Sequence, residues 1–178
     1  MSVYKTLNYS PNFNTKKRKP NQIKFIIFHY TGMKNESEAI ERLTSIKSKV
    51  SSHYLIKNNG EIVVMVPDLY VAWHAGVSSW KNFKSLNKYS IGIEISNPGH
   101  DYDYKKFSKK QIQSLKKLCK FLMKKYKILI TQDSHLVVYP NFFFNIPRNS
   151  IWCGAVSTLI IMIDQLRLIN LLHRLKIS

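Results

Sequence analysis

The fold of this chain is decided by the stretch Lys24-Phe25-Ile26-Ile27-Phe28-His29-Tyr30-Thr31. Its four consecutive apolar residues, Phe25 to Phe28, have high β-propensity and are typical of a strand that is buried on both faces. The residue that follows such a strand emerges at the edge of the sheet, where ligands of α/β proteins usually bind. His29 holds this position and is a candidate for chemistry, although a core histidine bonded to a neighbour fits the same pattern.

Further strands and two helices are expected beyond this stretch. Apolar runs indicate strands over 52–56, 61–66 and 89–96. Apolar residues at helical spacing predict helices over 35–46 and 107–126. We therefore predict the α/β class, with a single domain in which a central mixed and twisted β-sheet is flanked by helices.

The composition is that of a globular and strongly basic chain. Hydrophobic residues make up 44% of the 178 residues and charged residues 21%, which excludes a disordered class. The net charge is +18, which favours an anionic partner such as nucleic acid, anionic lipid or an acidic polymer. The lysines are scattered and form no compact arginine-rich patch, so a solvated surface is the simplest interpretation. We expect no nucleic-acid partner, because charge alone is an unspecific signal.

The N-terminal residues and the cysteines bear on the cellular location. The first 20 residues are polar, contain Pro11 and Pro20, and read as an arm on the surface. They include no apolar segment typical of a secretory signal, and the sequence has no run of 18 apolar residues that could span a membrane. Cys119 and Cys153 do not make a disulfide framework. We therefore expect a reduced, cytoplasmic protein without a membrane span. We also expect it to be a monomer.

Four polar residues stand in apolar or small-residue surroundings: His29, His53, His74 and Glu94. Glu94 is the most informative, because a carboxylate between Ile93 and Ile95 is costly to bury unless something pairs with it. Alternation along the strand places Glu94 on the same face as Gly92 and Ser96, and this small, polar face suits a cleft. Glu94 is therefore a candidate general base or acid, the alternative being an outward-facing residue on an edge strand.

Three histidines and a glutamate also raise the chance of a metal site. Zinc prefers imidazole and carboxylate ligands, and in catalytic sites it keeps one position open for water. The sequence contains no HExxH motif, and no two histidines have the spacing of neighbours on a helix. Spacing by itself therefore leaves the metal site open.

The order and spacing of several motifs carry a family resemblance. These motifs are Phe28-His29-Tyr30-Thr31, Val50-Ser51-Ser52-His53-Tyr54-Leu55-Ile56, Asn59-Gly60, Ala72-Trp73-His74-Ala75-Gly76-Val77-Ser78-Ser79-Trp80, Leu86-Asn87 and Ser90-Ile91-Gly92-Ile93-Glu94-Ile95-Ser96-Asn97. Over roughly residues 22–128 the chain resembles the zinc-dependent N-acetylmuramoyl-L-alanine amidases of the type-2 class, which are related to animal peptidoglycan recognition proteins. The Trp-His-Ala-Gly and Ser-Ile-Gly-Ile-Glu segments together are highly specific for this family.

The resemblance implies a role for each matching residue. His29 would be a zinc ligand, and Glu94 would act on the zinc-bound water as general base. The residues implied in substrate binding are His74, Ala75, Trp80 and Asn87. His53 would be structural or line the groove. The implied reaction is zinc-dependent hydrolysis of the amide between N-acetylmuramic acid and L-alanine in peptidoglycan fragments (muropeptides), as in cell-wall recycling, and a basic surface suits the carboxylates of the peptide stem.

The resemblance ends after residue 128. The family completes its zinc site with a histidine in Gly-His-Ser-Asp and an aspartate in Asp-Pro-Gly. This chain has Gln132-Asp133-Ser134-His135-Leu136 at about the right distance and no Asp-Pro-Gly. The composition changes at the same place. Lys176 is the only lysine after residue 128, and all five glutamates lie before residue 128. We therefore divide the chain into an N-terminal arm (1–20), an amidase-like core (21–128) and a divergent segment (129–178) expected to pack on the same domain.

Two interpretations of this segment stay open. In one, His135 is the second zinc ligand and an unmatched acid such as Asp133 completes the site. In the other, residues 129–178 are not the family's own C-terminus, because of a shifted reading frame, a fusion or rapid divergence. The chain would then be a catalytically disabled homologue that binds muropeptides without cleaving them.

Overall fold

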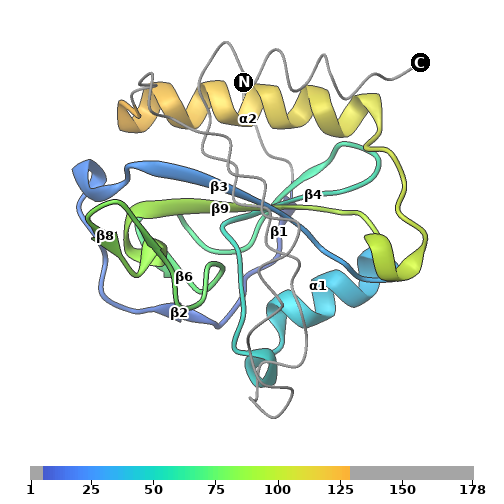
Figure 1. Cartoon of the computed structure of the whole chain (residues 1–178), viewed down its shortest axis with the longest axis horizontal. Coiled ribbons are helices and arrows are strands. Elements are labelled where there is room, and N and C mark those ends of the chain that lie inside the picture. Colours follow the sequence, from blue (N-terminus) through green and yellow to red (C-terminus); the bar gives the residue numbers. More distant parts are fainter. Residues whose placement is uncertain (1–5, 129–178) are drawn as a thin grey trace.

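The centre of the fold is a five-stranded sheet with the strand order β1-β5-β4-β9-β3 (Figure 1). The structure is a computed structural model and describes residues 6–128. The strands of this sheet are β1 (Thr6–Leu7), β3 (Phe25–Tyr30), β4 (Tyr54–Ile56), β5 (Ile62–Val64) and β9 (Ser90–Ile95). β9 is parallel to both β3 and β4, β1 is parallel to β5, and the β4–β5 pair is antiparallel. The predicted mixed sheet is therefore confirmed. The apolar stretch before His29 forms the first part of β3, but the strand continues through His29 and Tyr30, so His29 lies within the strand and not after it.

One helix covers each face of the sheet, with α1 (Glu36–Thr44) on one side and α2 (Lys109–Tyr126) on the other (Figure 1). Asn35 caps α1 and Ser108 caps α2, and each side chain accepts a backbone N–H of the first turn. These caps satisfy donors that have no partner within the helix. Both helices lie where the apolar spacing predicts them, which confirms the α/β class.

The two faces of the sheet differ in character, because successive side chains of a strand point to opposite sides. On the α2 side, Phe28, Tyr54 and Ile93 belong to the main hydrophobic cluster, together with Leu118 and Leu122 of the helix. The smaller cluster on the α1 side consists of Leu43, Leu55, Val63 and Met65. Because the cluster on the α1 side is small, part of the α1-facing surface of the central strands is occupied by polar side chains.

Two short antiparallel pairs and four turns of 3-10 helix surround the sheet within residues 6–128. β2 (Phe13–Asn14) pairs with β6 (Val71–Ala72), and β7 (Ser79–Trp80) pairs with β8 (Phe83–Lys84). The 3-10 turns are η1 (Pro20–Gln22), η2 (Ile46–Ser48), η3 (Leu86–Tyr89) and η4 (His100–Tyr102). The loop between β6 and β7 carries the Trp-His-Ala-Gly segment.

Residues of the predicted N-terminal arm take part in the fold. β1 extends the sheet by pairing with β5, in the register Thr6 with Val63 and Leu7 with Val64. Arg18 is buried, with only 6% of its surface exposed. This segment therefore contributes a strand and a buried cation to the domain.

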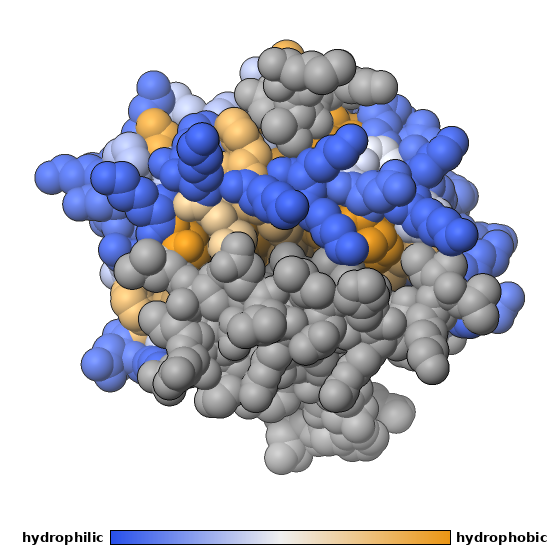
Figure 2. Space-filling model, turned by 90° about the horizontal axis from the view of Figure 1, so that it is seen from above, coloured by the Kyte–Doolittle hydropathy of each residue, from blue (hydrophilic) through white to orange (hydrophobic). Residues whose placement is uncertain are grey.

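The outer face of α2 carries much of the basic charge. Hydrophilic side chains spread over this side of the molecule, and hydrophobic surface shows between them (Figure 2). The exposed lysines of α2 include Lys109, Lys110, Lys117, Lys120 and Lys124. Their spacing around the helix fits a solvated basic surface. None of the helices formed by residues 6–128 has the length and apolar character that crossing a membrane requires.

Candidate functional site

A row of three histidines with one glutamate lies on the α1 side of the sheet. His29 on β3 and Glu94 on β9 are paired in parallel register, and Leu55 of β4 pairs with Glu94 from the other side. Because Leu55 packs in the α1-side cluster, its partners in register point to that side as well. The ring of His74 lies between those of His29 and His53, with centroid distances of 5.2 Å and 5.6 Å. The structure thus brings together the four polar residues that stand out in the sequence.

His29 and Glu94 each carry a buried atom that bonds nothing in the chain. Only 1% of the surface of His29 and 2% of that of Glu94 are exposed. Within residues 6–128, His29 Nδ1 and Glu94 Oε2 are the buried side-chain polar atoms without a hydrogen-bond partner. An unsatisfied buried polar group costs about 1–3 kcal/mol, so its presence calls for a ligand or a reaction that uses it. This pair is therefore the strongest functional candidate in the described part of the chain.

Burial shifts the protonation of both side chains. Desolvation lowers the pKa of His29 to about 3, so its imidazole is neutral at neutral pH. Desolvation raises the pKa of Glu94 to about 8, against the opposing effect of the charge on Arg42. A neutral imidazole is suited to metal binding, and a carboxyl group of high proton affinity is suited to proton transfer.

The donor chemistry of this pair fits part of a zinc site. His29 Nδ1 is suited to be a ligand, because it is buried, belongs to a neutral ring and has no other partner. Residues 6–128 contain no group of three or more histidine, cysteine, aspartate or glutamate side chains arranged to hold a metal ion. A catalytic zinc usually has three protein ligands, so further ligands would have to come from other residues. The predicted second ligand, His135, lies outside the described residues.

His53 has both ring nitrogens bonded to the backbone. Its Nδ1 accepts the N–H of Gly92 at 2.9 Å, so the ring proton is on Nε2 and is donated to the carbonyl oxygen of Tyr70 at 3.1 Å. Arg18 Nη2 approaches the same Nε2 to 3.0 Å. Burial, and after it the charge of Arg18, lower the pKa of His53 to about 3. His53 therefore holds β4, β9 and the segment before β6 together as a neutral side chain.

Replacing His53 with asparagine should make the stability of the metal-free chain less sensitive to acid. Asparagine Oδ1 can still accept the Gly92 N–H, but the residue no longer titrates. The unfolded chain protonates His53 below about pH 6.5, whereas the folded chain does so only near pH 3, so stability falls with falling pH between these values. This one group contributes a slope of about 1.4 kcal/mol per pH unit. Urea unfolding across this range should show a slope shallower by that amount in His53→Asn, and parallel curves would contradict the prediction.

Arg18 is a buried residue that sequence reasoning missed. Its Nη1 donates to the carbonyl oxygens of Asn87 and Ser90, at 3.0 Å and 2.7 Å. Its Nε and Nη2 donate to the carbonyl oxygen of Asp68, at 3.2 Å and 2.8 Å. Burial lowers the pKa of Arg18 to about 10, so the guanidinium is still charged at neutral pH. In the sequence Arg18 stands within Lys16-Lys17-Arg18-Lys19, where no signal distinguishes it from a solvated charge run.

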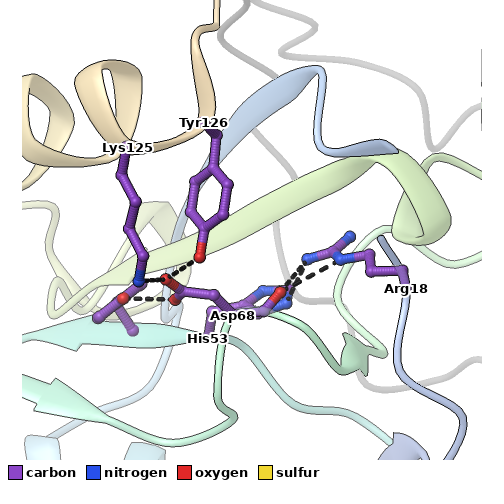
Figure 3. Close-up of polar contacts among 6 residues, drawn as sticks. Arg18, His53, Asp68, Lys125 and Tyr126 are labelled. Carbon is purple, nitrogen blue, oxygen red and sulfur yellow. Dashed lines mark hydrogen bonds and ion pairs between the residues drawn. The ribbon is translucent and has the colours of Figure 1, made fainter. Parts of the chain in front are cut away.

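Asp68 connects Arg18 to the end of α2 (Figure 3). Its carboxylate accepts hydrogen bonds from Tyr54 at 2.5 Å, from Tyr126 at 2.6 Å and from Lys125 at 2.8 Å. Burial acts to raise the pKa of Asp68, but these three hydrogen bonds outweigh it and keep the pKa below its usual value. The network therefore fixes the last turn of α2 against the segment that follows β5.

The predicted substrate-binding residues lie in and around the loop 73–78. The side-chain oxygen of Asn87 accepts the backbone N–H of His74 at 3.1 Å and that of Ala75 at 2.7 Å. Trp80 is half-buried in β7, at the far end of this loop. Asn87 thus fixes the loop backbone, and contact of these residues with a substrate stays a prediction.

A buried histidine and a buried carboxyl group on neighbouring strands of a mixed sheet are typical of an α/β domain with a catalytic or ligand-binding site. The sequence pattern of a known family matches residues 19–146, which is most of the chain and includes both side chains. The chain belongs to this family, the N-acetylmuramoyl-L-alanine amidases of the type-2 class. The family resemblance of the motifs is therefore confirmed.

Two relatives illustrate the similarity. The N-acetylmuramoyl-L-alanine amidase AmiD of Escherichia coli (strain K12) is 37% identical over 119 residues, which cover 60% of this chain and 42% of AmiD. The 1,6-anhydro-N-acetylmuramyl-L-alanine amidase AmpD of Haemophilus influenzae is 29% identical over 141 residues, which cover 70% of this chain and 73% of that protein. This chain therefore spans less than half of the length of AmiD.

Solved structures share the fold. A crystal structure of a selenomethionine derivative of AmpD matches with a TM-score of 0.58 and 27% identity, over 71% of this chain and 78% of that chain. The complex of AmiD from E. coli with the substrate anhydro-N-acetylmuramic acid-L-Ala-D-γ-Glu-L-Lys matches with a TM-score of 0.54 and 34% identity, over 65% of this chain and 48% of that chain. These structures confirm the predicted fold class.

Proposed function

We propose that this chain is a zinc-dependent N-acetylmuramoyl-L-alanine amidase, which hydrolyses the amide bond between N-acetylmuramic acid and L-alanine in peptidoglycan fragments. The observation that carries the proposal is the pair of buried, unpartnered atoms His29 Nδ1 and Glu94 Oε2, on residues paired in register between β3 and β9. Family membership supports the amidase activity, since AmiD is named as an N-acetylmuramoyl-L-alanine amidase and AmpD as a 1,6-anhydro-N-acetylmuramyl-L-alanine amidase.

The proposed metal site includes His29, which the structure describes, and residues beyond 128, which it does not describe. His29 would hold zinc through Nδ1, His135 would be the second protein ligand, and an acid such as Asp133 would complete the set. Zinc, when bound, supplies a Lewis acid that polarises the amide carbonyl and makes water more acidic.

Glu94 moves the proton in this reaction. Its Oε2 accepts a proton from the attacking water and delivers it to the nitrogen of L-alanine as the C–N bond breaks. Burial raises the pKa of Glu94 to about 8, so the side chain is a strong proton acceptor. A cation beside it would favour the charged form, which is the form that a general base needs.

The proposed substrate is a soluble muropeptide, in the manner of cell-wall recycling. The substrate in the AmiD complex and the name of AmpD both contain an anhydro-muramyl group. The net charge of +18 suits the carboxylates of a peptide stem. His74, Ala75, Trp80 and Asn87 are proposed to border this substrate. A cytoplasmic location, a monomeric state and packing of residues 129–178 on the same domain belong to the same proposal.

The zinc content of the purified full chain tests this function. One zinc per chain is expected in the parent and none in His29→Ala or His135→Ala, because each change removes a ligand. His53→Asn is the matched control from the same row of histidines and should keep its zinc, since both nitrogens of His53 bond the backbone.

Activity is measured on the same samples, with anhydro-N-acetylmuramic acid-L-Ala-D-γ-Glu-L-Lys as substrate and the released tripeptide as readout. Only the zinc-bound parent and the His53→Asn control should release it. A parent chain without zinc or tripeptide release would overturn the proposal and favour the alternative, a homologue that binds muropeptides without cleaving them.

A further inference from the structure

The hydroxyl of Ser90 sets the direction of a hydrogen-bond chain that ends at His29. Ser90 Oγ lies 2.7 Å from the carbonyl oxygen of Leu86, and a carbonyl can only accept, so Ser90 donates its proton there. His74 Nε2 lies 3.1 Å from Ser90 Oγ and must therefore be the donor in that bond. A neutral imidazole carries one ring proton, so with this proton on Nε2 the Nδ1 of His74 has a free lone pair.

The direction of the hydrogen bond between His74 and His29 is fixed in the same way. His29 Nε2 lies 3.0 Å from His74 Nδ1, and it must donate because His74 Nδ1 has no proton. A neutral imidazole carries one proton, so the Nδ1 of His29 is left with a lone pair. This Nδ1 is the buried atom that has no partner within residues 6–128. The reverse direction would put a proton on this atom, where the described chain offers no acceptor.

The ring of His74 is held in place by the sheet below it. A Cβ atom on Gly92 would lie 2.4 Å from His74 Cγ, so only glycine leaves room for the imidazole on this strand. The backbone N–H of His74 is bonded to Asn87, which fixes the loop from the other side. His74 therefore has a single position, in which its two nitrogens reach Ser90 and His29.

We propose that His74 is a positioning residue, which is oriented by Ser90 and fixes His29 in the tautomer that leaves Nδ1 free to bind a metal ion. The tautomer follows from the hydrogen bonds alone, and only the identity of the ion as zinc rests on the proposed function. Residues behind a metal-bound histidine set its tautomer and usually affect metal affinity about 10- to 100-fold. This role is additional to the proposed place of His74 at the border of the substrate.

The tautomer of His29 can be measured without zinc. Long-range ¹H–¹⁵N spectra of the zinc-free full chain, labelled with ¹⁵N-histidine, distinguish protonated from unprotonated ring nitrogens, and His29→Ala identifies the His29 signals. The parent should show His29 protonated on Nε2 and unprotonated on Nδ1. A His29 protonated on Nδ1 would overturn the inference.

Two substitutions of His74 separate positioning from packing. His74→Phe fills the same space without an acceptor, so His29 should become a mixture of tautomers and zinc affinity should fall about 10- to 100-fold. His74→Asn places Oδ1 where Nδ1 was, so it should restore the His29 signals and most of the affinity. Unaltered His29 signals in a folded His74→Phe chain would overturn the inference.

A third variant, Ser90→Ala, tests the same role if His74→Phe does not fold. If circular dichroism shows that His74→Phe does not fold, Ser90→Ala replaces it, because it keeps His74 and removes the hydroxyl that accepts from His74 and donates to the carbonyl oxygen of Leu86. Ser90→Ala should also produce a tautomer mixture at His29, and unaltered signals would overturn the inference. A parent chain that binds no zinc would overturn the proposed function, whereas the spectra would still decide the role of His74.

Discussion

Replacing Glu94 with glutamine is expected to slow the proposed hydrolysis of the muramoyl–L-alanine amide by about 100- to 10,000-fold without loss of the proposed zinc. Glutamine has the size of glutamate, but its side chain cannot take a proton from water at neutral pH. Glu94 Oε2 has no hydrogen-bond partner within residues 6–128, so the change breaks no bond of that atom that holds the fold together. The loss of activity should therefore come from proton transfer and not from unfolding.

The same substitution should leave the free energy of unfolding unchanged or raise it. Burial raises the pKa of Glu94 to about 8, which means that the folded chain disfavours the charged carboxylate, and a neutral amide avoids this cost. Such a gain in stability with a loss of function is common at active sites. Glu41→Gln, on the exposed side of α1, makes the same chemical change and should keep full activity. Turnover in Glu94→Gln equal to that of the parent would refute the role given to Glu94.

Replacing Arg18 with alanine is expected to lower the free energy of unfolding by about 3–5 kcal/mol. The change removes the buried donors that reach the carbonyl oxygens of Asp68, Asn87 and Ser90. Each unsatisfied buried acceptor costs about 1–3 kcal/mol, and part of this is regained because a buried charge disappears. Since domains of this size are stable by about 5–15 kcal/mol, the variant should lie close to the limit of folding.

Urea denaturation measures this effect as a lower midpoint with an unchanged slope. Lys16→Ala is the matched control, because it removes one positive charge from the same segment at an exposed position, and its midpoint should equal that of the parent. Arg18→Lys should fall between the two, since an ammonium group cannot span three carbonyl oxygens as a guanidinium does. Equal midpoints for Arg18→Ala and Lys16→Ala would show that the buried hydrogen bonds of Arg18 do not stabilise the fold.

Much of the fold and part of the candidate site were predictable from the sequence. The apolar run before His29 predicted β3, the helical spacing predicted α1 and α2, and the alternation around Glu94 placed this side chain on a polar face. These predictions succeeded because strand and helix periodicity are properties of the backbone over a few residues. The family motifs pointed to His29 and Glu94 through the same local segments.

The partners of these side chains were decided only by the tertiary structure. His29 meets His74 across 45 positions of sequence, and Arg18 meets Ser90 across 72. Nothing in the local pattern encodes such pairs, because they depend on which strands become neighbours and in which register. The sequence by itself therefore determined the main strands, the two helices, the family and the two candidate residues, but not β1 or the short pairs β2–β6 and β7–β8. The tautomer of His29, the burial of Arg18 and the place of His74 over Gly92 were decided by packing between distant segments, which is a property of the whole fold.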